Sequence, residues 1–182
     1  MADAANGDGP AAAGVATLPL SDLGTHLLPW VLATLLLVTD QVTKQFVLAG
    51  IAPHELVPVA HPYLYFTHTR NPGIAFGLHL GGWSRPIFVA AALAVLLLLI
   101  SIYRSTRPTE RARRYAIAML CAGAVGNLID RIRWEEGVVD FVRLTVAGYD
   151  WPIFNVADIS VTLGAVLLGL SLLADARPRR AF

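Results

Sequence analysis

Charged residues are scarce in this chain. Only 15% of its 182 residues are Asp, Glu, Lys or Arg, whereas 55% are hydrophobic. With a mean hydropathy of +0.58, this composition lies outside the usual range of soluble domains. Cysteine is almost absent as well, because Cys121 is the single one, which excludes a disulfide within the chain and a metal site built from several thiolates. The composition therefore indicates a membrane protein without a disulfide framework.

Basic residues are missing before the first apolar run. That run is also longer than the apolar region of a secretory signal peptide, so we expect it to remain as a membrane span. A bilayer core needs about 20 apolar residues per helix. Four stretches are long enough, namely residues 25–49, 83–103, 115–132 and 153–174. The sequence therefore predicts four transmembrane helices.

The basic residues that do occur are unevenly placed. Eight of the fourteen Lys and Arg residues lie in two clusters, residues 104–114 between the second and third predicted helices and residues 177–180 near the C-terminus. The positive-inside rule places both clusters in the cytoplasm, and with four spans the N-terminus lies there too. Neither cluster contains interleaved aromatic residues or a recognisable binding module, so we expect no nucleic-acid partner.

The chain divides into three expected parts. Residues 1–24 are rich in Ala and Gly and predict a flexible cytoplasmic extension, residues 25–174 contain the four helices, and residues 175–182 form a basic cytoplasmic tail. Residues 63–69 alternate bulky and polar side chains, which is typical of a strand or hairpin. The predicted fold class is an all-α membrane protein with four transmembrane helices and a small extracytoplasmic β-sheet, or cradle, between helices 1 and 2, at about residues 50–82.

Polar residues gather at one end of the predicted helices. With the basic loop inside, the C-terminal ends of helices one and three and the N-terminal ends of helices two and four face outside. Charges at membrane depth are usually paired or functional. The residues at these ends are Asp40 and Lys44, Asn127, Asp130 and Arg131, and Asn155 and Asp158, with Asp140 in the loop between helices three and four.

Within each helix these residues are three or four positions apart, so each helix presents one polar face to a common point. Two interpretations of Asp40 and Lys44 are equally good. They form a structural ion pair, or they belong to a functional site. We interpret Asn127 and Arg131 as supports around a site in preference to a simple interhelical hydrogen bond.

The carboxylates are the main source of chemistry. The sequence has no Ser/His/Asp set, no histidines at metal-ligand spacing and no glycine-rich phosphate loop, so no metal or cofactor is expected. Asp140 in VVDFV and Asp158 in VADIS have no neutralising neighbour. If they lie close together they share one proton, and the ionised member can activate water while the protonated member polarises a carbonyl. The residues alone leave open a hydrolase, a proton or ion carrier, and purely structural polar contacts.

Five short motifs add a resemblance to a known family. DQVTK at 40–44, NPGIAFG at 71–77, GNLIDR at 126–131, VVDF at 138–141 and FNVAD at 154–158 occur in that order. Together they resemble the bacterial lipoprotein signal peptidases, or type II (prolipoprotein) signal peptidases. The resemblance implies a metal-independent intramembrane aspartyl endopeptidase of the cytoplasmic (inner) membrane. Such an enzyme removes signal peptides from prolipoproteins, cutting just before a diacylglyceryl-modified cysteine near the outer face.

The same resemblance implies roles for individual residues. Asp140 and Asp158 match the catalytic aspartates, and Asp130 ranks behind them because Arg131 is a ready partner that would keep it ionised and structural. We expect Asn71 and Arg131 to hydrogen-bond the peptide or the lipid head. Implied partners are diacylglyceryl-modified prolipoproteins, membrane lipids and globomycin-type inhibitors, and we expect a monomer. The expected substrate-binding or supporting residues are Asp40, Lys44, Asn71, Gly73, Asn127, Asp130, Arg131 and Asn155.

Overall fold

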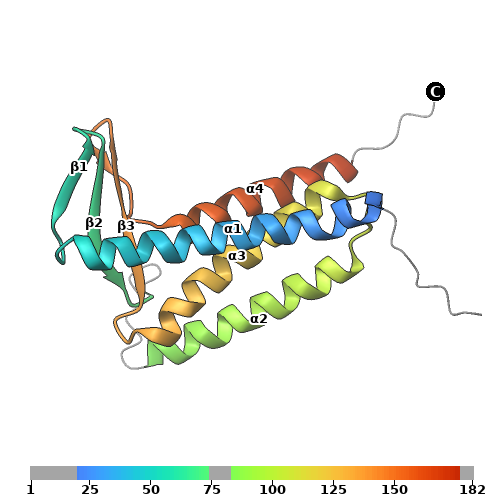
Figure 1. Ribbon diagram of the computed structural model, residues 1–182, viewed down its shortest axis with the longest axis horizontal. Helices are drawn as coiled ribbons and strands as arrows, with labels where there is room; N and C mark the ends of the chain where they lie inside the picture. The colour runs from blue at the N-terminus through green and yellow to red at the C-terminus, as the bar shows by residue number, and fades with distance from the viewer. Residues whose placement is uncertain (1–19, 74–82, 177–182) are drawn as a thin grey trace, which may run out of the picture.

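Four long helices run side by side in the computed structural model, which describes residues 20–73 and 83–176 (Figure 1). Each helix is long and apolar enough to cross a membrane. The prediction of four transmembrane helices is therefore confirmed, although the first helix begins earlier than expected and the last begins later. The helices are α1 (Leu20–Gly50), α2 (Ser84–Ser105), α3 (Arg111–Arg133) and α4 (Val156–Asp175).

Parts of three expected segments lie outside the described residues. They are residues 1–19 of the N-terminal extension, residues 74–82 at the end of the cradle, and residues 177–182 of the basic tail.

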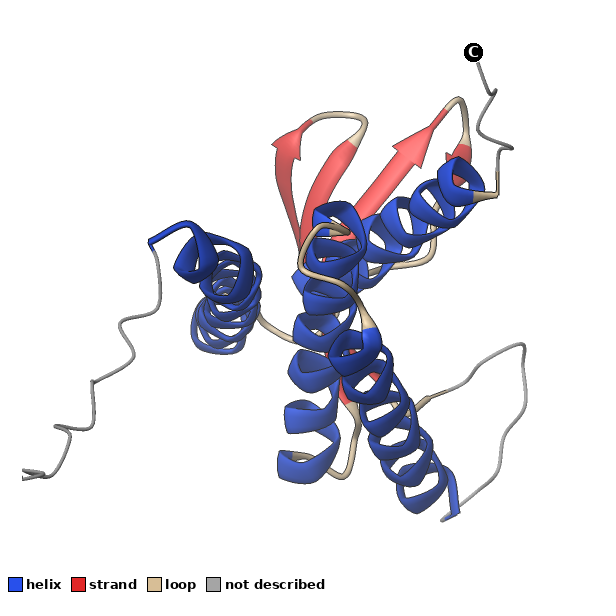
Figure 2. Cartoon of the chain, turned by 90° about the vertical axis from the view of Figure 1, so that its right-hand side faces the viewer, coloured by secondary structure: helices blue, strands red, loops and turns tan. Residues whose placement is uncertain are grey.

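A small antiparallel sheet lies at one end of the helices (Figures 1 and 2). Its order is β1 (Leu56–Ala60), β2 (Leu64–Asn71), β3 (Val138–Val146) and β4 (Tyr149–Asp150). The first two strands lie between α1 and α2, as predicted. The other two come from the connection between α3 and α4.

Asp140 therefore lies in strand β3, and its expected place in a loop is wrong. The run VVDFV is β-branched and aromatic on both sides of the aspartate, a composition that favours a strand. Its backbone pairs with β2, with Thr69 opposite Asp140 and Asn71 opposite Val138. Through this pairing the sheet joins the connection after α1 to the connection after α3.

Helix α3 is the central helix of the bundle. It packs against α1, α2 and α4, most extensively against α4. Half of its most apolar window is buried inside the protein, compared with 11–22% for the other three helices. Small side chains make this possible, because Ala116, Ala118 and Ala122 are almost fully buried and let the neighbouring helices approach.

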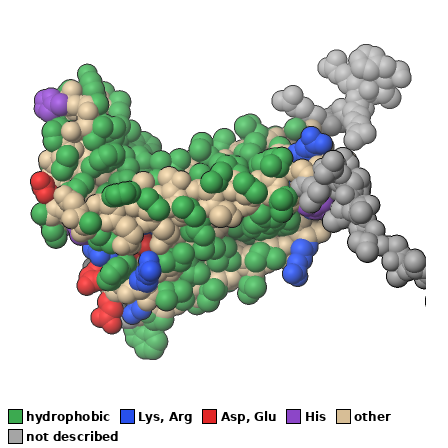
Figure 3. Space-filling model, viewed as in Figure 1, with side chains coloured by type: hydrophobic (Ala, Val, Ile, Leu, Met, Phe, Trp, Pro, Cys, Tyr) green, Lys and Arg blue, Asp and Glu red, His purple; other side chains and the backbone are tan. Residues whose placement is uncertain are grey.

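The outer faces of the other helices carry large apolar side chains. Leu35 on α1, Leu97 on α2 and Leu163 on α4 are 59%, 70% and 52% exposed. Hydrophobic side chains cover most of the helices in Figure 3, and the acidic side chains visible in that view lie at the sheet end. A surface of this kind is suited to lipid, and it leaves the ends of the bundle for polar groups.

Close contact between α3 and α4 predicts different outcomes for two glycines of α4. A Cβ at Gly164 would lie 2.9 Å from the Ala116 carbonyl oxygen and 3.0 Å from the Leu120 nitrogen, whereas a Cβ at Gly169 meets nothing within 4 Å. We expect Gly164→Ala to lower the free energy of unfolding by about 1–3 kcal/mol. The control Gly169→Ala should be neutral or stabilising by up to about 1 kcal/mol, because Ala favours helix. Thermal unfolding in detergent compares the two, and equal shifts would contradict the packing described.

Candidate active site

The polar residues predicted at the helix ends come together where the sheet meets the bundle. Three groups of contacts hold them there, namely a buried ion cluster around Lys44, a pair of linked asparagines, and a helix cap at the start of α4.

Lys44 on α1 is the centre of the ion cluster. Its Nζ lies 2.8 Å from Asp40 Oδ2 and 2.9 Å from Asp130 Oδ2, and the three side chains are almost fully buried. It also donates a hydrogen bond of 3.1 Å to Asn127 Oδ1. The expectation that Arg131 is the partner of Asp130 is wrong, since Lys44 on another helix takes that place. One ammonium group thus binds three side chains, one from its own helix and two from α3.

The two acids of this cluster also fix the elements that follow. Asp40 Oδ1 accepts a hydrogen bond of 2.8 Å from the Ala157 nitrogen in the first turn of α4, where a negative charge is favoured. Asp130 Oδ2 accepts one of 3.1 Å from the Val139 nitrogen on β3. Gly126 leaves room for this arrangement, because a Cβ there would lie 2.6 Å from Asp40 Oδ2. Both acids therefore help to hold α4 and β3 against the other helices.

Two asparagines link Asp140 to Asp158. Asn155 Nδ2 donates to Asp140 Oδ1 at 2.7 Å and to Asn127 Oδ1 at 3.1 Å, and Asn127 Nδ2 donates to Asp158 Oδ1 at 2.8 Å. The orientation of the Asn127 amide follows from Lys44, which can only donate and so must face the amide oxygen. The two carboxylates are joined through these amides and connected to the ion cluster.

A capping box sets the position of Asp158. Asn155 is the N-cap of α4 and its Oδ1 accepts from the Asp158 nitrogen at 3.0 Å, while the Asn155 nitrogen donates to Asp158 Oδ2 at 3.1 Å. Helix four was expected to begin at Ile153, with Asn155 and Asp158 in its first two turns. It begins at Val156 because the asparagine side chain satisfies the free N–H groups of the first turn.

Asp140 is held from both sides on β3. It is 4% exposed, and besides the bond from Asn155 its Oδ2 accepts one of 3.0 Å from Asn71 Nδ2 on β2. Burial and the negative charge of Asp158 raise the pKa of Asp140 to about 6, whereas the hydrogen bonds from the two asparagines lower it. A carboxyl group in this state can take up and release a proton near neutral pH.

Asn71, for which a hydrogen bond to the substrate was expected, makes two hydrogen bonds within the protein. Its amide donates to Asp140, and its Oδ1 accepts a hydrogen bond of 3.0 Å from the Gly73 nitrogen, so both ends are engaged within the protein. Gly73 has φ +92° and a Cβ there would collide with the Phe88 ring, which explains the glycine. Asn71 therefore holds the carboxylate of Asp140 with a side chain whose two ends both have partners within the protein.

Arg131 keeps a donor available. Its Nη1 donates to the Asn127 carbonyl at 3.2 Å, and its guanidinium lies over the Phe88 ring at 5.5 Å. Its Nε is buried and has no hydrogen-bond partner in the part of the chain that the structure describes. Sequence reasoning missed Phe88, for which no polar motif gives a signal. It also missed Gln41, which lies inside DQVTK and donates to Asp40 and to the Gly126 carbonyl.

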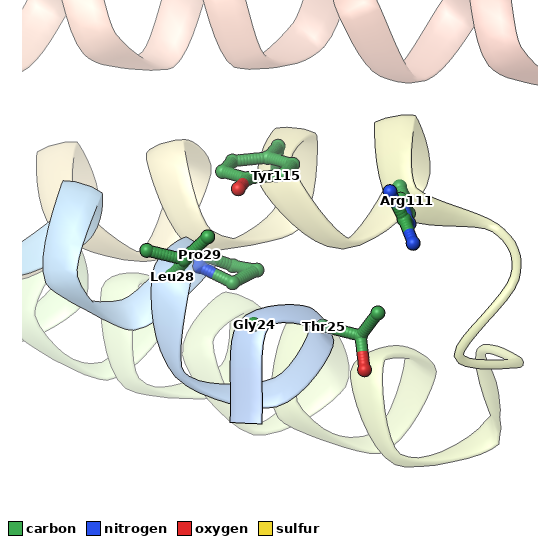
Figure 4. A pocket seen from close by; sticks show the side chains of 6 residues that line it. All are labelled: Gly24, Thr25, Leu28, Pro29, Arg111 and Tyr115. Atoms are coloured by element: carbon green, nitrogen blue, oxygen red, sulfur yellow. The ribbon is translucent and has the colours of Figure 1, made fainter. Parts of the chain in front are cut away.

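An apolar groove opens beside Asp158. It has a volume of about 400 Å³ and runs between α4 and the strands β3 and β4. A second cavity, of about 110 Å³, lies at the other end of the bundle between α1 and α3 (Figure 4). This second cavity has no carboxylate in its lining, whereas Asp158 lines the groove. The groove is lined by Leu144, Trp151, Phe154, Asp158, Ile159, Thr162 and Leu163.

Metal ligands are not grouped in the described part of the chain. Among residues 20–73 and 83–176, no set of three or more His, Cys, Asp and Glu side chains is placed to hold a metal ion. The acids that lie near one another are engaged by Lys44 and by amide groups. The arrangement places one carboxylate, Asp158, at an apolar groove and links it through amides to a buried one, Asp140, whose pKa is raised.

The ion cluster predicts a large effect of Lys44 on stability. Lys44→Met leaves Asp40 and Asp130 buried without a cation, so we expect the free energy of unfolding to fall by about 3–5 kcal/mol. Arg143→Met is the control, because Arg143 pairs with Asp150 at the surface and its loss should cost at most about 1 kcal/mol. Thermal unfolding in detergent checks both, and a Lys44→Met shift no larger than the control would contradict the role of the cluster.

The family model and the similar known proteins agree on one protein family. The model of the signal peptidase (SPase) II family, peptidase family A8, matches residues 32–174. The lipoprotein signal peptidase of Desulforapulum autotrophicum is 40% identical over 138 residues, which cover 74% of this chain and 85% of that protein. The lipoprotein signal peptidase of Moorella thermoacetica is 36% identical over 145 residues, covering 80% and 92%.

Solved structures agree with the sequence relatives. One bacterial membrane enzyme superimposes with a TM-score of 0.77 at 32% identity, covering 86% of this chain and 96% of its own. A second has a TM-score of 0.75 at 33% identity, covering 83% and 96%. With its four apolar helices and its small sheet, the chain belongs to the signal peptidase II family of aspartic peptidases and is a multi-pass bacterial membrane enzyme.

Proposed function

We propose that this enzyme removes signal peptides from prolipoproteins, with Asp140 and Asp158 as its catalytic dyad. The relatives named above are lipoprotein signal peptidases. The observation that carries the dyad is the chain of amides from Asp140 through Asn155 and Asn127 to Asp158. The other two buried acids at the sheet end of the described residues, Asp40 and Asp130, both form ion pairs with Lys44. The cleaved bond is proposed to be the one just before a diacylglyceryl-modified cysteine.

The environments of the two acids divide their roles. Burial raises the pKa of Asp140, so it carries the shared proton and donates to the carbonyl oxygen of the scissile bond. Asp158 accepts a backbone N–H at the start of α4, where the helix dipole favours a negative charge, and it lines the open groove. It is the ionised member that takes a proton from water.

The proposed reaction has two steps, addition of water to the carbonyl group and cleavage of the C–N bond. Water oxygen bonds to the carbonyl carbon as its proton passes to Asp158 and the Asp140 proton passes to the carbonyl oxygen, which gives a neutral gem-diol. Asp158 next donates its proton to the leaving nitrogen, the C–N bond breaks, and Asp140 recovers a proton from one hydroxyl. The products are the signal peptide acid and the amine of the lipidated cysteine, and the dyad returns to its starting state.

Substrate positioning is assigned to the groove and to Arg131. The groove beside Asp158 is lined by apolar side chains and suits the apolar part of a lipidated peptide. The buried Nε of Arg131 can donate to a peptide carbonyl without breaking another bond of the described residues. These two features align an extended peptide across the dyad.

The proposed membrane arrangement places the site near the outer face. The arginine-rich connection between α2 and α3 lies at the end opposite the sheet, so the positive-inside rule puts that end, with both termini, in the cytoplasm (Figure 1). The domains proposed are a cytoplasmic N-terminal extension, a peptidase domain with its cradle, and a basic tail. We further propose that the enzyme works as a monomer among membrane lipids and that globomycin-type peptides inhibit it.

Replacement of each aspartate tests the dyad. We expect Asp140→Asn and Asp158→Asn to reduce cleavage of a diacylglyceryl-modified prolipoprotein by at least about 10²–10⁴-fold, because each removes a proton-transfer group. Asp150→Asn is the control, since Asp150 is an exposed acid of the same sheet and should keep full activity. All variants are assayed with EDTA and checked by thermal unfolding. Wild-type cleavage by either folded dyad variant would remove that residue from the mechanism and bring Asp130 forward.

The raised pKa of Asp140 predicts an alkaline fall in kcat/KM. Activity falls as Asp140 loses its proton, so this fall belongs above the ordinary carboxyl range, at pH 6 or higher. The inflection is a property of the coupled pair of acids. Rates measured in the window where the protein stays folded test this. A rate that stays constant from acid pH to pH 9 would contradict a carboxyl group as the acid.

A further inference from the structure

Arg70 lies next to the site but on the other face of the sheet. It is on β2 between Thr69 and Asn71, and both of these neighbours donate side-chain hydrogen bonds to Asp140. Because side chains alternate along a strand, Arg70 projects away from Asp140. Its guanidinium lies 4.9 Å from the centre of the Trp134 ring.

Trp134 is the residue at which α3 ends. Its nitrogen donates to the Asp130 carbonyl at 2.8 Å, and its carbonyl accepts from the Gly137 nitrogen at 3.4 Å, which closes the turn that leads into β3. Gly137 has φ +95°, and a Cβ on it would collide with the Asn71 carbonyl. The turn therefore lies directly against the backbone of Asn71.

The Arg70 guanidinium interacts with the Trp134 ring and with no other charged or polar group of the described residues. No hydrogen bond or ion pair of its guanidinium occurs within the described residues, and its Nη1 is buried without an acceptor there. A guanidinium over an indole face is attracted by the ring, more strongly when water is excluded. The stack thus joins the end of β2 to the end of α3 at the place where Asn71 leaves the sheet.

We propose that Arg70 and Trp134 are positioning residues for catalysis, whose stack holds Asn71 in place to donate its hydrogen bond to Asp140. This inference rests on the proposed role of Asp140. It gives the two residues a function through Asn71, without contact with the substrate. Asn71 is the last residue of β2, so strand pairing supports its backbone from the N-terminal side only, and the stack of its neighbour Arg70 on Trp134 supports the end of the strand.

Loss of the stack has a defined effect on proton transfer. The hydrogen bond from Asn71 lowers the pKa of Asp140, so its weakening raises that pKa. Asp140 then keeps its proton to higher pH, and the alkaline fall in kcat/KM moves upward. A structural role alone lowers the melting temperature and leaves the position of this fall unchanged.

The experiment compares pH profiles of prolipoprotein cleavage by purified full-length variants. We expect Arg70→Gln and Trp134→Leu to lower kcat/KM at its optimum by about tenfold and to move the alkaline inflection up by several tenths of a pH unit, the direction expected of Asn71→Ala. Trp134→Phe keeps an aromatic face and should restore most of the rate. Arg143→Gln removes a positive charge from β3 outside the stack and should leave the profile unchanged.

A double-mutant cycle separates this inference from its alternatives. In the Asn71→Ala background, Arg70→Gln should change the profile little further, because the bond that it supports is already absent. Equal effects of Arg70→Gln with and without Asn71, or an unchanged inflection in a folded Arg70→Gln variant, would overturn the positioning role. Asp140→Asn in the same assay distinguishes the two proposals, since cleavage by that variant overturns the dyad itself.

Discussion

One buried ammonium group, that of Lys44, holds the helices and the sheet together around the candidate active site. Lys44 Nζ lies within 2.9 Å of both Asp40 and Asp130 and donates to Asn127. Charges in a water-poor interior are costly unless they are paired, so each of these groups requires the others. Because Asp40 also accepts from the first turn of α4 and Asp130 from β3, the pairing fixes three helices and a strand at once. The two acids of the proposed dyad lie on the elements fixed in this way.

The beginning of α4 shows how a local signal serves a distant site. An asparagine three residues before an aspartate is a usual way to begin a helix, since each side chain satisfies a backbone N–H of the other. Here Asn155 also donates to Asp140 and to Asn127. The same side chain ends the irregular connection, starts the helix and joins the two carboxylates. Its complete burial follows from these three tasks.

The sequence predicts the helices and their polar ends well because both depend on chain-local features. Apolar stretches of about 20 residues define the spans, and the alternating direction of consecutive spans decides which helix ends lie together. The partner of Asp130 was predicted wrongly because the nearest cation in sequence, Arg131, is not the nearest in space, where Lys44 approaches from α1. Strand β3 was missed for a similar reason. A single nine-residue strand with an acid near its start becomes recognisable only with its partner β2, which is about 70 residues away.

The position of the sheet at the end of the bundle follows from the same balance of forces. A strand edge in the lipid core would leave backbone groups without hydrogen bonds, whereas at the end of the helices they can meet water. Hydrolysis also needs water, and a lipid-anchored peptide brings its cleavage site close to the surface. Asp158, beside the open groove, and Asp140, buried behind the sheet, therefore occupy the boundary where water, peptide and acyl chains can meet. In the proposed mechanism the shielded acid carries the shared proton and the acid beside the groove is the base, so the unequal exposure of the two carboxyl groups supports a division of roles within one step.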